Sequence, residues 1–463
     1  MAIVISNAVI ATGDDKDTVH YGAAIAIEGD KIAAIGANEE IAAEYPAAEK
    51  IDGSGKLVMP GFANIHTHLT MTMARGVFED LSPSHKPPFT GGLSPIPLPD
   101  MTPDERRAMA ELGALEAMRS GTTLMLEDSN NIDHYAGALA ESGLRFLFGE
   151  RAYDRVGTSI GDPGPLTIDR ALGQQHMQTI ERNFRDWDGK ANGRVHICIS
   201  AWAPDMCSPE LLKDLSALQK KLDTRITIHL NQIWGEVAAI KAHYNRLPSE
   251  YLADLDFLND KVICAHARCM TPEEEKILGK ARVNVSFNAA IAARRGLSPR
   301  IADLEGYGCN VGMGSDNMAE DMVEVLRTGL FMERVRREDG RSPTPEQALR
   351  WATRNGYQAL GVPNAGWLEA GNKADMIVID LQRAHLVPML RAVSNFVHNG
   401  QARDVEGVMV DGKWTMRDGK VLTMDEPGII ARAQKTANEC WSRLFRKRFD
   451  LKVPAGFSPH ALP

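Results

Sequence analysis

The chain has 463 residues, of which 44% are hydrophobic and 24% are charged, proportions that are ordinary for a folded globular protein. Its formal net charge of -9 argues against nucleic acids and anionic membranes as partners, and no apolar run is long enough to span a bilayer. The six cysteines are scattered and form no Cys-x-x-Cys pair, which predicts reduced, buried thiols and a cytoplasmic location.

Short β-like runs separated by turns open the chain. The N-terminus lacks the basic segment of a signal peptide and has the pattern of a first strand. Gly29-Asp30 lies between two such runs and predicts a hairpin. Similar runs return near residues 374–380 and 405–416. Because neither set can bury a core alone, we expect residues 1–58 and 366–425 to form one small composite β-sandwich domain.

Strands and helices alternate between these ends, which is the pattern of a parallel β/α barrel. A helix is expected over Pro103–Ser120, opened by a cap at Thr102 and ended by Gly121. Together with the strand that carries His66, seven further runs give the eight strands that a closed barrel needs: Thr122–Glu127, Leu144–Phe148, Val195–Ala201, Arg225–Leu230, Val262–His266, Val283–Asn288 and Cys309–Gly314. The sequence therefore predicts an α/β fold with a TIM-like (β/α)8 barrel over residues 59–365.

Two stretches fall outside this alternation. Residues 81–99 contain too many prolines for a helix or an inner strand, which fits either a cover over the active site or a solvated insertion. Residues 426–463 form a C-terminal helix and tail, with an amphipathic, basic-ended helix over Ile429–Phe449. At this net charge, we expect the helix to pack on the protein or on a partner subunit rather than on nucleic acid.

Histidines and one aspartate lie at the ends of the predicted barrel strands. His66 and His68 are two residues apart on one strand, so their side chains point the same way. His229 and His266 end two later strands, and Asp316 follows the last one. A lone histidine at a strand end usually has no chemical role. Since the carboxyl ends of barrel strands converge, the five residues together predict a metal-dependent active site.

The order His-x-His, His, His, Asp resembles that of the amidohydrolase superfamily. Longer stretches strengthen the resemblance to the branch of triazine hydrolases and heterocycle aminohydrolases, possible neighbours being phenylurea and thiocarbamate hydrolases: Pro60–His68, Met73–Gly76, Arg119–Thr123, Gly314–Asp316, Trp351–Gly356 and Gly366–Asp380.

This resemblance implies a ligand set of His66, His68, His229 and Asp316 for one divalent metal ion. Zn2+ is the expected ion, with Mn2+, Co2+ or Fe2+ as alternatives. Asp316 would also move protons, and His266 would contact the attacking water or the substrate. No lysine ends the run Val195–Ala201, so the carbamylated-lysine bridge of two-metal relatives is not evident.

The chain departs from the pattern of the heterocycle-processing branch at Gln232, where that branch carries a glutamate. An amide can form hydrogen bonds but cannot transfer a proton. Glu236 is the nearest replacement, and we expect it on a solvated helix face. Trp202 and Phe287 stand where histidine and a His-Asn-Pro-type segment are usual, so we expect both, with Asn288 and Gln232, to line a partly apolar substrate pocket.

These departures favour hydrolysis of an acyclic C–N bond, as in an N-aryl urea, a carbamate or an anilide. The alternative is an aminohydrolase, either a deaminase or a dechlorinase, acting on an amino-substituted N-heterocycle such as a triazine or pyrimidine. A third possibility, a degenerate barrel kept for binding, conflicts with the complete ligand set. We expect a small-molecule substrate and a homo-oligomer, without nucleic acid or membrane as partner.

Overall fold

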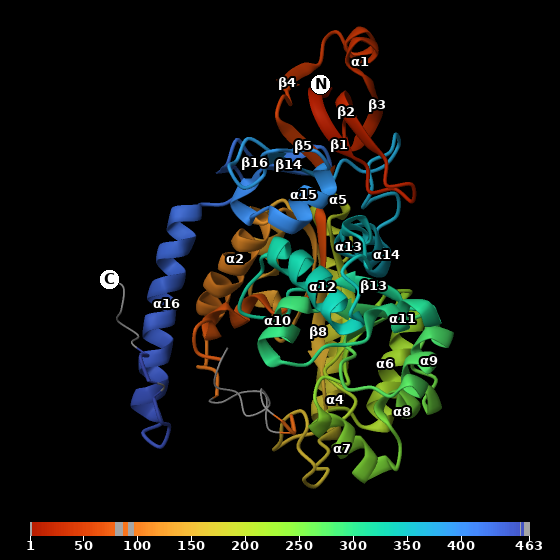
Figure 1. Cartoon of the computed structure of the whole chain (residues 1–463). Coiled ribbons are helices and arrows are strands. Elements are labelled where there is room, and N and C mark those ends of the chain that lie inside the picture. Colours follow the sequence, from red (N-terminus) through yellow and green to blue (C-terminus); the bar gives the residue numbers. More distant parts are fainter. Residues whose placement is uncertain (1, 79–86, 91–96, 454, 458–463) are drawn as a thin grey trace.

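The computed structural model describes residues 2–78, 87–90, 97–453 and 455–457. A β/α barrel forms the body of the molecule, and a sheet built from both chain ends covers one end of it (Figure 1). The C-terminal helix lies along the side of the barrel (Figure 1). The predicted fold class is therefore confirmed.

Eight parallel strands close the barrel within the described chain, in the order β10-β11-β12-β13-β6-β7-β8-β9. Every residue of β7 and β10 is buried, as expected for strands covered on both faces. All eight strands predicted from the sequence are confirmed, with these bounds: β6 (Phe62–Thr67), β7 (Thr122–Ser129), β8 (Arg145–Ala152), β9 (Val195–Ala201), β10 (Ile226–Leu230), β11 (Val262–His266), β12 (Asn284–Phe287) and β13 (Asn310–Met313).

Helices surround this barrel. The predicted helix after Thr102 is α2 (Pro103–Arg119), and Thr102 and Glu105 form its capping box. Short 3-10 turns η1 (Leu69–Ala74) and η3 (Ile132–His134) follow β6 and β7. The other helices are α3 (Ala136–Glu141), α4 (Arg170–Trp187), α5 (Lys190–Gly193), α6 (Pro209–Leu222), α7 (Trp234–Tyr244), α8 (Pro248–Asp254), α9 (Pro272–Ala281), α10 (Ala289–Arg295), α11 (Ile301–Tyr307), α12 (Met322–Arg337), α13 (Pro345–Ala352) and α14 (Arg354–Leu360).

The second sheet joins the two ends of the chain through β5 and β14, whose antiparallel register pairs Met59 with Ile377. The hairpin predicted at Gly29-Asp30 is confirmed, since Glu28 pairs with Lys31 across the turn. Among the described residues this sheet has nine strands: β1 (Ile3–Ala11), β2 (Val19–Glu28), β3 (Lys31–Ala37), β4 (Glu49–Asp52), β5 (Lys56–Pro60), β14 (Met376–Asp380), β15 (Val405–Val410), β16 (Lys413–Arg417) and β17 (Lys420–Val421). Helices α1 (Asn38–Glu44) and α15 (Ala392–Asn399) and the turn η4 (Ala402–Asp404) connect its strands.

Strand β5 leads directly into β6, so the sheet and the first barrel strand are continuous in the chain. Gly61 makes the junction, and a Cβ there would lie 2.2 Å from Thr123 Oγ1. A buried ion pair also ties the two parts together: Arg145 Nε of β8 donates to Asp375 Oδ2 at 2.5 Å, and its Nη2 donates to Asp411. Strand β6 is thus anchored at its start to a sheet that contains both ends of the chain.

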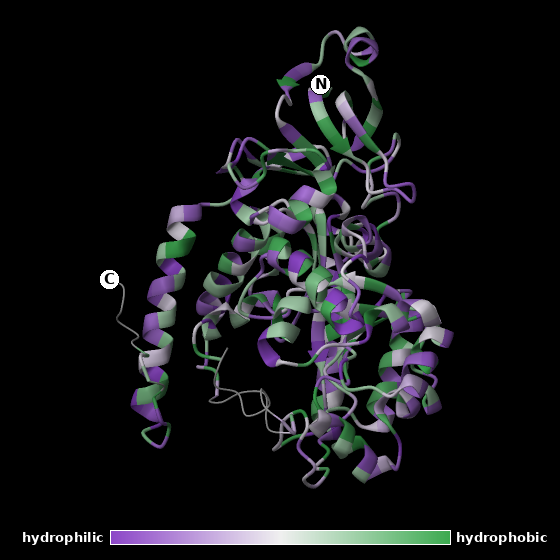
Figure 2. Cartoon of the chain, in the orientation of Figure 1, coloured by the Kyte–Doolittle hydropathy of each residue, from purple (hydrophilic) through white to green (hydrophobic). Residues whose placement is uncertain are grey.

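Helix α16 (Glu426–Lys447) alternates hydrophobic and hydrophilic residues and packs on α2 (Figure 2). Trp441 Nε1 donates to the carbonyl of Met73 at 2.8 Å, and Arg443 pairs with Glu105 at 2.9 Å. The expected packing of this helix on the protein is confirmed. Among the described helices, none combines the length and apolar character of a membrane span. All six cysteines are buried and free, as predicted.

Candidate metal centre

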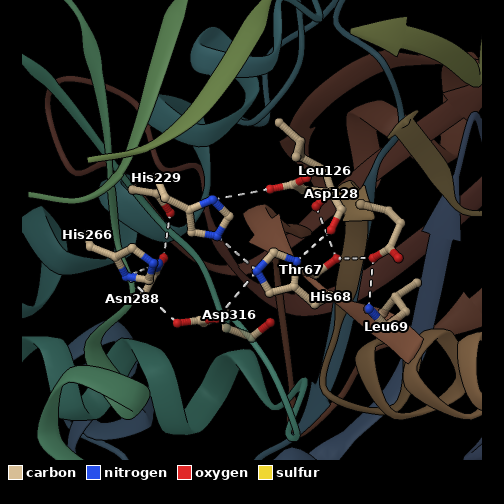
Figure 3. A network of polar contacts seen from close by, with 12 residues as sticks. Thr67, His68, Leu69, Leu126, Asp128, His229, His266, Asn288 and Asp316 are labelled. Carbon is tan, nitrogen blue, oxygen red and sulfur yellow. Dashed lines mark hydrogen bonds and ion pairs between the residues drawn. The ribbon is translucent and has the colours of Figure 1, made fainter. Parts of the chain in front are cut away.

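Four imidazoles and two carboxylates, those of Asp128 and Asp316, gather at the carboxyl ends of the barrel strands. Figure 3 shows both carboxylates with His68, His229 and His266. The ring of His66 lies between the others, with centroid distances of 4.7 Å to His68, 4.8 Å to His229 and 5.3 Å to His266. Asp316 Oδ1 lies 3.6 Å from His68 Nε2. The structure therefore brings together the five residues singled out in the sequence.

The ring nitrogens of these histidines are oriented for metal binding. His68 Nδ1 donates to the carbonyl of Asp128 at 2.6 Å and His229 Nδ1 to that of Trp202 at 2.7 Å, which leaves both Nε2 lone pairs free. These two Nε2 atoms face each other at 3.2 Å. Neither nitrogen of the buried His66 has a partner among the described residues. Such a set of orphaned imidazole nitrogens fits a divalent metal ion.

Backbone hydrogen bonds fix Asp316 beside the first metal strand. Its N–H donates to the carbonyl of His66 at 2.9 Å, and its own carbonyl accepts from the N–H of His68 at 2.8 Å. Its φ of 71° is unusual for a non-glycine residue and marks a constrained position. Gly314 leaves the necessary room, since a Cβ there would lie 2.5 Å from Asn288 Oδ1.

His266 differs from the other three histidines in the role of its nitrogens. Its Nδ1 accepts from Asn288 Nδ2 at 3.1 Å, and the Asn288 amide is oriented by Ser286, whose Oγ donates to its Oδ1 at 2.6 Å. The proton of this neutral ring is consequently on Nε2, which has no partner in the described part of the chain. His266 is thus a hydrogen-bond donor at the centre, and Asn288 positions it.

Burial keeps the imidazoles neutral. It lowers the pKa of His66 to about 4, with a further contribution from His229, and it lowers the pKa of His229 to about 4 as well. The pKa values of His68 and His266 fall well below their ordinary value for the same reason. Neutral imidazole is the form that binds metal ions, so the ligands are ready at neutral pH.

Asp128, near the end of β7, is a residue of the centre that the sequence patterns did not predict. Its carboxylate pairs with Arg151 at 3.2 Å, accepts from Ser200 Oγ at 2.7 Å and lies 3.7 Å from His229 Nδ1. Burial alone would raise its pKa, but Arg151 and the imidazoles lower it below the ordinary value. The sequence feature that could have indicated it is the acidic pair Glu127-Asp128 at the end of a barrel strand. The predicted strand stopped one residue too early.

The preceding residue, Glu127, holds the segment after the His-x-His motif. One carboxyl oxygen accepts from the N–H of Leu69 at 2.8 Å and from Thr67 Oγ1 at 3.0 Å, and the other accepts from the hydroxyl of Tyr135 at 2.8 Å. Burial raises the pKa of Glu127 to about 7. Glu127 therefore positions the backbone that carries His68 and does not itself face the centre.

A cavity of about 620 Å³ opens over the centre. Gln232 and Trp202 line it, as predicted, and Gln232 Oε1 has no partner within the described residues. The guanidinium of Arg151 lies 5.5 Å from the centre of the Trp202 ring. The predicted cover over residues 81–99 falls largely outside the described residues, but Pro97, Leu98 and Pro99 are described and line the cavity.

Three expectations about individual side chains were wrong. Asn288 was expected to line the pocket, but it is buried and does not line the described cavity. Glu236 is not on a solvated face: it is fully buried and accepts the N–H groups of Asn231 and Gln232 at 2.7 and 2.8 Å. It therefore fixes the loop that carries Gln232. Phe287 does not line the described cavity; it is fully buried in the core, with its ring centre 6.4 Å from that of Trp351.

Two curated relatives are similar over nearly the whole chain. A 5-methylthioadenosine/S-adenosylhomocysteine deaminase from Pelotomaculum thermopropionicum is 31% identical over 450 residues, covering 94% of this chain and 98% of the relative. A 5'-deoxyadenosine deaminase from Methanothermobacter thermautotrophicus is 31% identical over 398 residues, covering 84% and 88%. These names contradict the expectation of a urea, carbamate or anilide substrate. The resemblance to phenylurea hydrolases, which was inferred because Gln232 replaces a glutamate, is therefore wrong: the similar relatives are named deaminases.

Solved structures agree on the fold. An adenosine deaminase from Xanthomonas campestris with bound zinc has a TM-score of 0.84 at 20% identity, covering 95% of this chain and 98% of that one. An atrazine chlorohydrolase from Arthrobacter aurescens complexed with zinc has a TM-score of 0.81 at 22% identity, covering 94% and 100%. The model of the amidohydrolase family matches residues 57–415. This chain therefore belongs to the amidohydrolase family.

Proposed function

We propose that this protein is a zinc-dependent aminohydrolase, which exchanges an amino group on a nitrogen heterocycle for oxygen from water and releases ammonia. The observation that carries the proposal is the set of imidazole nitrogens without partners at the base of a nucleoside-sized cavity. Imidazole and carboxylate ligands suit zinc. The names of the relatives support an amino-substituted ring as substrate.

The ligand set in this proposal is His66, His68, His229 and Asp316, around a single ion. When bound, the ion supplies a Lewis acid that activates water. Asp128 has a different part: paired with Arg151, it places a negative charge beside His229 and His68. This negative charge orients the ligand histidines and increases their basicity.

Asp316 and His266 carry the proton transfers in this scheme. Asp316 Oδ2 has no hydrogen-bond partner among the described residues, so it can accept a proton from the attacking water and later give it to the leaving amine. His266 Nε2 can donate to the oxygen as negative charge develops on it. The Asn288 amide keeps His266 in the donor tautomer.

Gln232 fits contact with the ring. Its side chain faces the cavity, and its backbone is fixed by Glu236. The amide can donate to a ring nitrogen or accept from a ring N–H, but it cannot supply a proton. The proton needed by the leaving amine must then come through Asp316, which accounts for a deaminase that has no acid at this position.

The test is ammonia release from a panel of rings by the zinc-loaded protein. The panel holds 5'-deoxyadenosine, 5'-methylthioadenosine, S-adenosylhomocysteine, an aminopyrimidine, an aminopyrimidine carboxylate and an aminotriazine. We expect ammonia from at least one ring, at a rate that Asp316→Asn abolishes. Ammonia release no faster than from the Asp316→Asn variant, on every ring, would refute the proposal.

A further inference from the structure

Two buried arginines near the metal centre have no hydrogen-bonded carboxylate among the described residues. Arg268 follows β11 and Arg295 ends α10; they are 7% and 6% exposed. None of the three guanidinium nitrogens of Arg268 has a hydrogen-bond partner in the described part of the chain, and the same holds for Nε and Nη1 of Arg295. A buried guanidinium without a partner costs several kcal/mol, roughly, in folding free energy. Such a cost usually accompanies a function.

The neighbouring acids are already occupied. Glu236 accepts two backbone N–H groups through its two carboxyl oxygens, and burial raises its pKa well above the ordinary value. Asp128 is paired with Arg151. Asp316 approaches Arg295 Nη1 only to 3.9 Å, beyond hydrogen-bond distance, and belongs to the metal centre. A bound divalent cation would add further positive charge to this end of the cavity.

Arg295 reaches the same cavity as Gln232 and the metal centre. Arg268 lies behind the cavity wall: its backbone N–H donates to the carbonyl of Asn231 at 3.1 Å, next to Gln232. Arg295 therefore gives this end of the substrate cavity a positive charge, and Arg268 adds a second, buried charge behind it. Guanidinium groups bind carboxylates with paired, charge-assisted hydrogen bonds.

We propose that Arg295 and Arg268 form a subsite for a carboxylate carried on the heterocycle of the substrate. Because Arg295 Nη1 lies 3.9 Å from Asp316 Oδ2, a carboxylate bound to it would lie close to the metal centre, which favours a group on the ring over one on a long substituent. This inference rests on the aminohydrolase function proposed above and narrows its substrate class. A neutral ring would leave both arginines unpaired.

Binding by calorimetry to the zinc-loaded protein tests the inference without turnover. The probes are 4-aminopyrimidine-5-carboxylate and its neutral carboxamide. We expect the carboxylate to bind about tenfold or more tightly than the carboxamide, which is the size of a good charge-assisted pair. Equal binding of the two probes would overturn the inference.

Variants identify the arginines responsible. Arg295→Met and Arg268→Met should abolish the preference, whereas Arg294→Met should keep it, because Arg294 pairs with Glu324 and does not line the cavity. Arg268→Met should also raise the melting temperature of the ligand-free protein, since it removes a buried charge. A preference that survives both cavity variants, or a lower melting temperature for Arg268→Met, would count against the subsite.

The two proposals can fail separately. If the carboxylate is preferred but no ring yields ammonia, the aminohydrolase function fails and the subsite remains. If the ring carboxylate and its neutral carboxamide yield ammonia equally fast, in the wild type and in Arg295→Met alike, the function stands and the subsite is wrong.

Discussion

The Nε2 atoms of His68 and His229 lie 3.2 Å apart while the other nitrogen of each ring donates to a backbone carbonyl. Two lone pairs therefore face each other in a buried space. Without a cation between them the two lone pairs repel, and this repulsion lowers the free energy of unfolding. The metal-free protein should for this reason be measurably less stable than the loaded one.

Removal of the metal by a chelator should lower the melting temperature, and added zinc should restore it. An ion present at a hundred times its dissociation constant stabilises the folded state by about 2.7 kcal/mol. His68→Ala should lose the response to zinc. The control is His196→Ala, whose side chain is 48% exposed and far from the centre, and which should keep it. A zinc response retained by His68→Ala would contradict the ligand set.

The raised pKa of Glu127 predicts a pH-dependent difference from Glu127→Gln. The folded protein holds this proton up to a pKa of about 7, above the ordinary 4.5, so the associated stability is complete below pH 4.5 and is lost as the pH rises through 7. Glutamine mimics the protonated form at every pH. As the pH rises from 4.5 to 8, the free energy of unfolding measured in urea should increase for the variant relative to the wild type, by on the order of 3 kcal/mol. A constant difference would show that Glu127 stays ionised.

Asp316→Asn should reduce ammonia release by about a thousandfold or more, because the amide cannot accept the proton of the attacking water. Circular dichroism and the melting curve should still report a folded protein. Asp254→Asn is the matched control, since Asp254 forms an exposed pair with Arg246. Activity close to wild type in Asp316→Asn would remove this residue from the mechanism.

Gln232→Glu should raise ammonia release from adenine nucleosides, by about tenfold or more, because a carboxyl can protonate the ring nitrogen. Gln232→Met has a similar volume but neither donates nor accepts strongly, and it should lower release from every ring. Steady-state kinetics on both variants separates the effects on kcat and KM. Identical kinetics for the three proteins would mean that this side chain does not touch the ring.

Asp375→Ala should destabilise the protein by about 3–5 kcal/mol, because it leaves Arg145 buried without its main partner. Asp254→Ala breaks an exposed pair and should cost at most about 1 kcal/mol. Urea unfolding measures both. A similar small loss in the two variants would mean that the Arg145 pair does not join the barrel to the composite sheet energetically.

The elements that the sequence predicted well are those with strong local patterns. Buried parallel strands are continuous apolar runs, so all eight barrel strands could be found, and the strand-end histidines followed from them. Glu236 and Phe287 were misjudged for the opposite reason. The position of Phe287 depends on a residue distant in the sequence, Trp351. The position of Glu236 depends on backbone N–H groups in a turn whose conformation the sequence pattern does not predict.

Asp128 and the arginine pair show the same limit for charges. An aspartate one residue past a strand's apolar run looks like an ordinary strand end. Only the folded barrel brings Arg151 and Ser200 against it. Likewise, nothing near Arg268 or Arg295 in the sequence indicates that both are buried or that, within the described part of the chain, neither is hydrogen-bonded to an acid.

The pairing of β5 with β14 has a consequence for biosynthesis. During translation the N-terminal strands emerge first, but the edge of β5 stays unpaired until the segment around Ile377 leaves the ribosome. An open strand edge next to the His-x-His segment is a template for wrong pairing with other nascent chains. Truncated chains that end before β14 should therefore aggregate rather than fold into a smaller enzyme, and chaperones that shield strand edges should matter most late in synthesis.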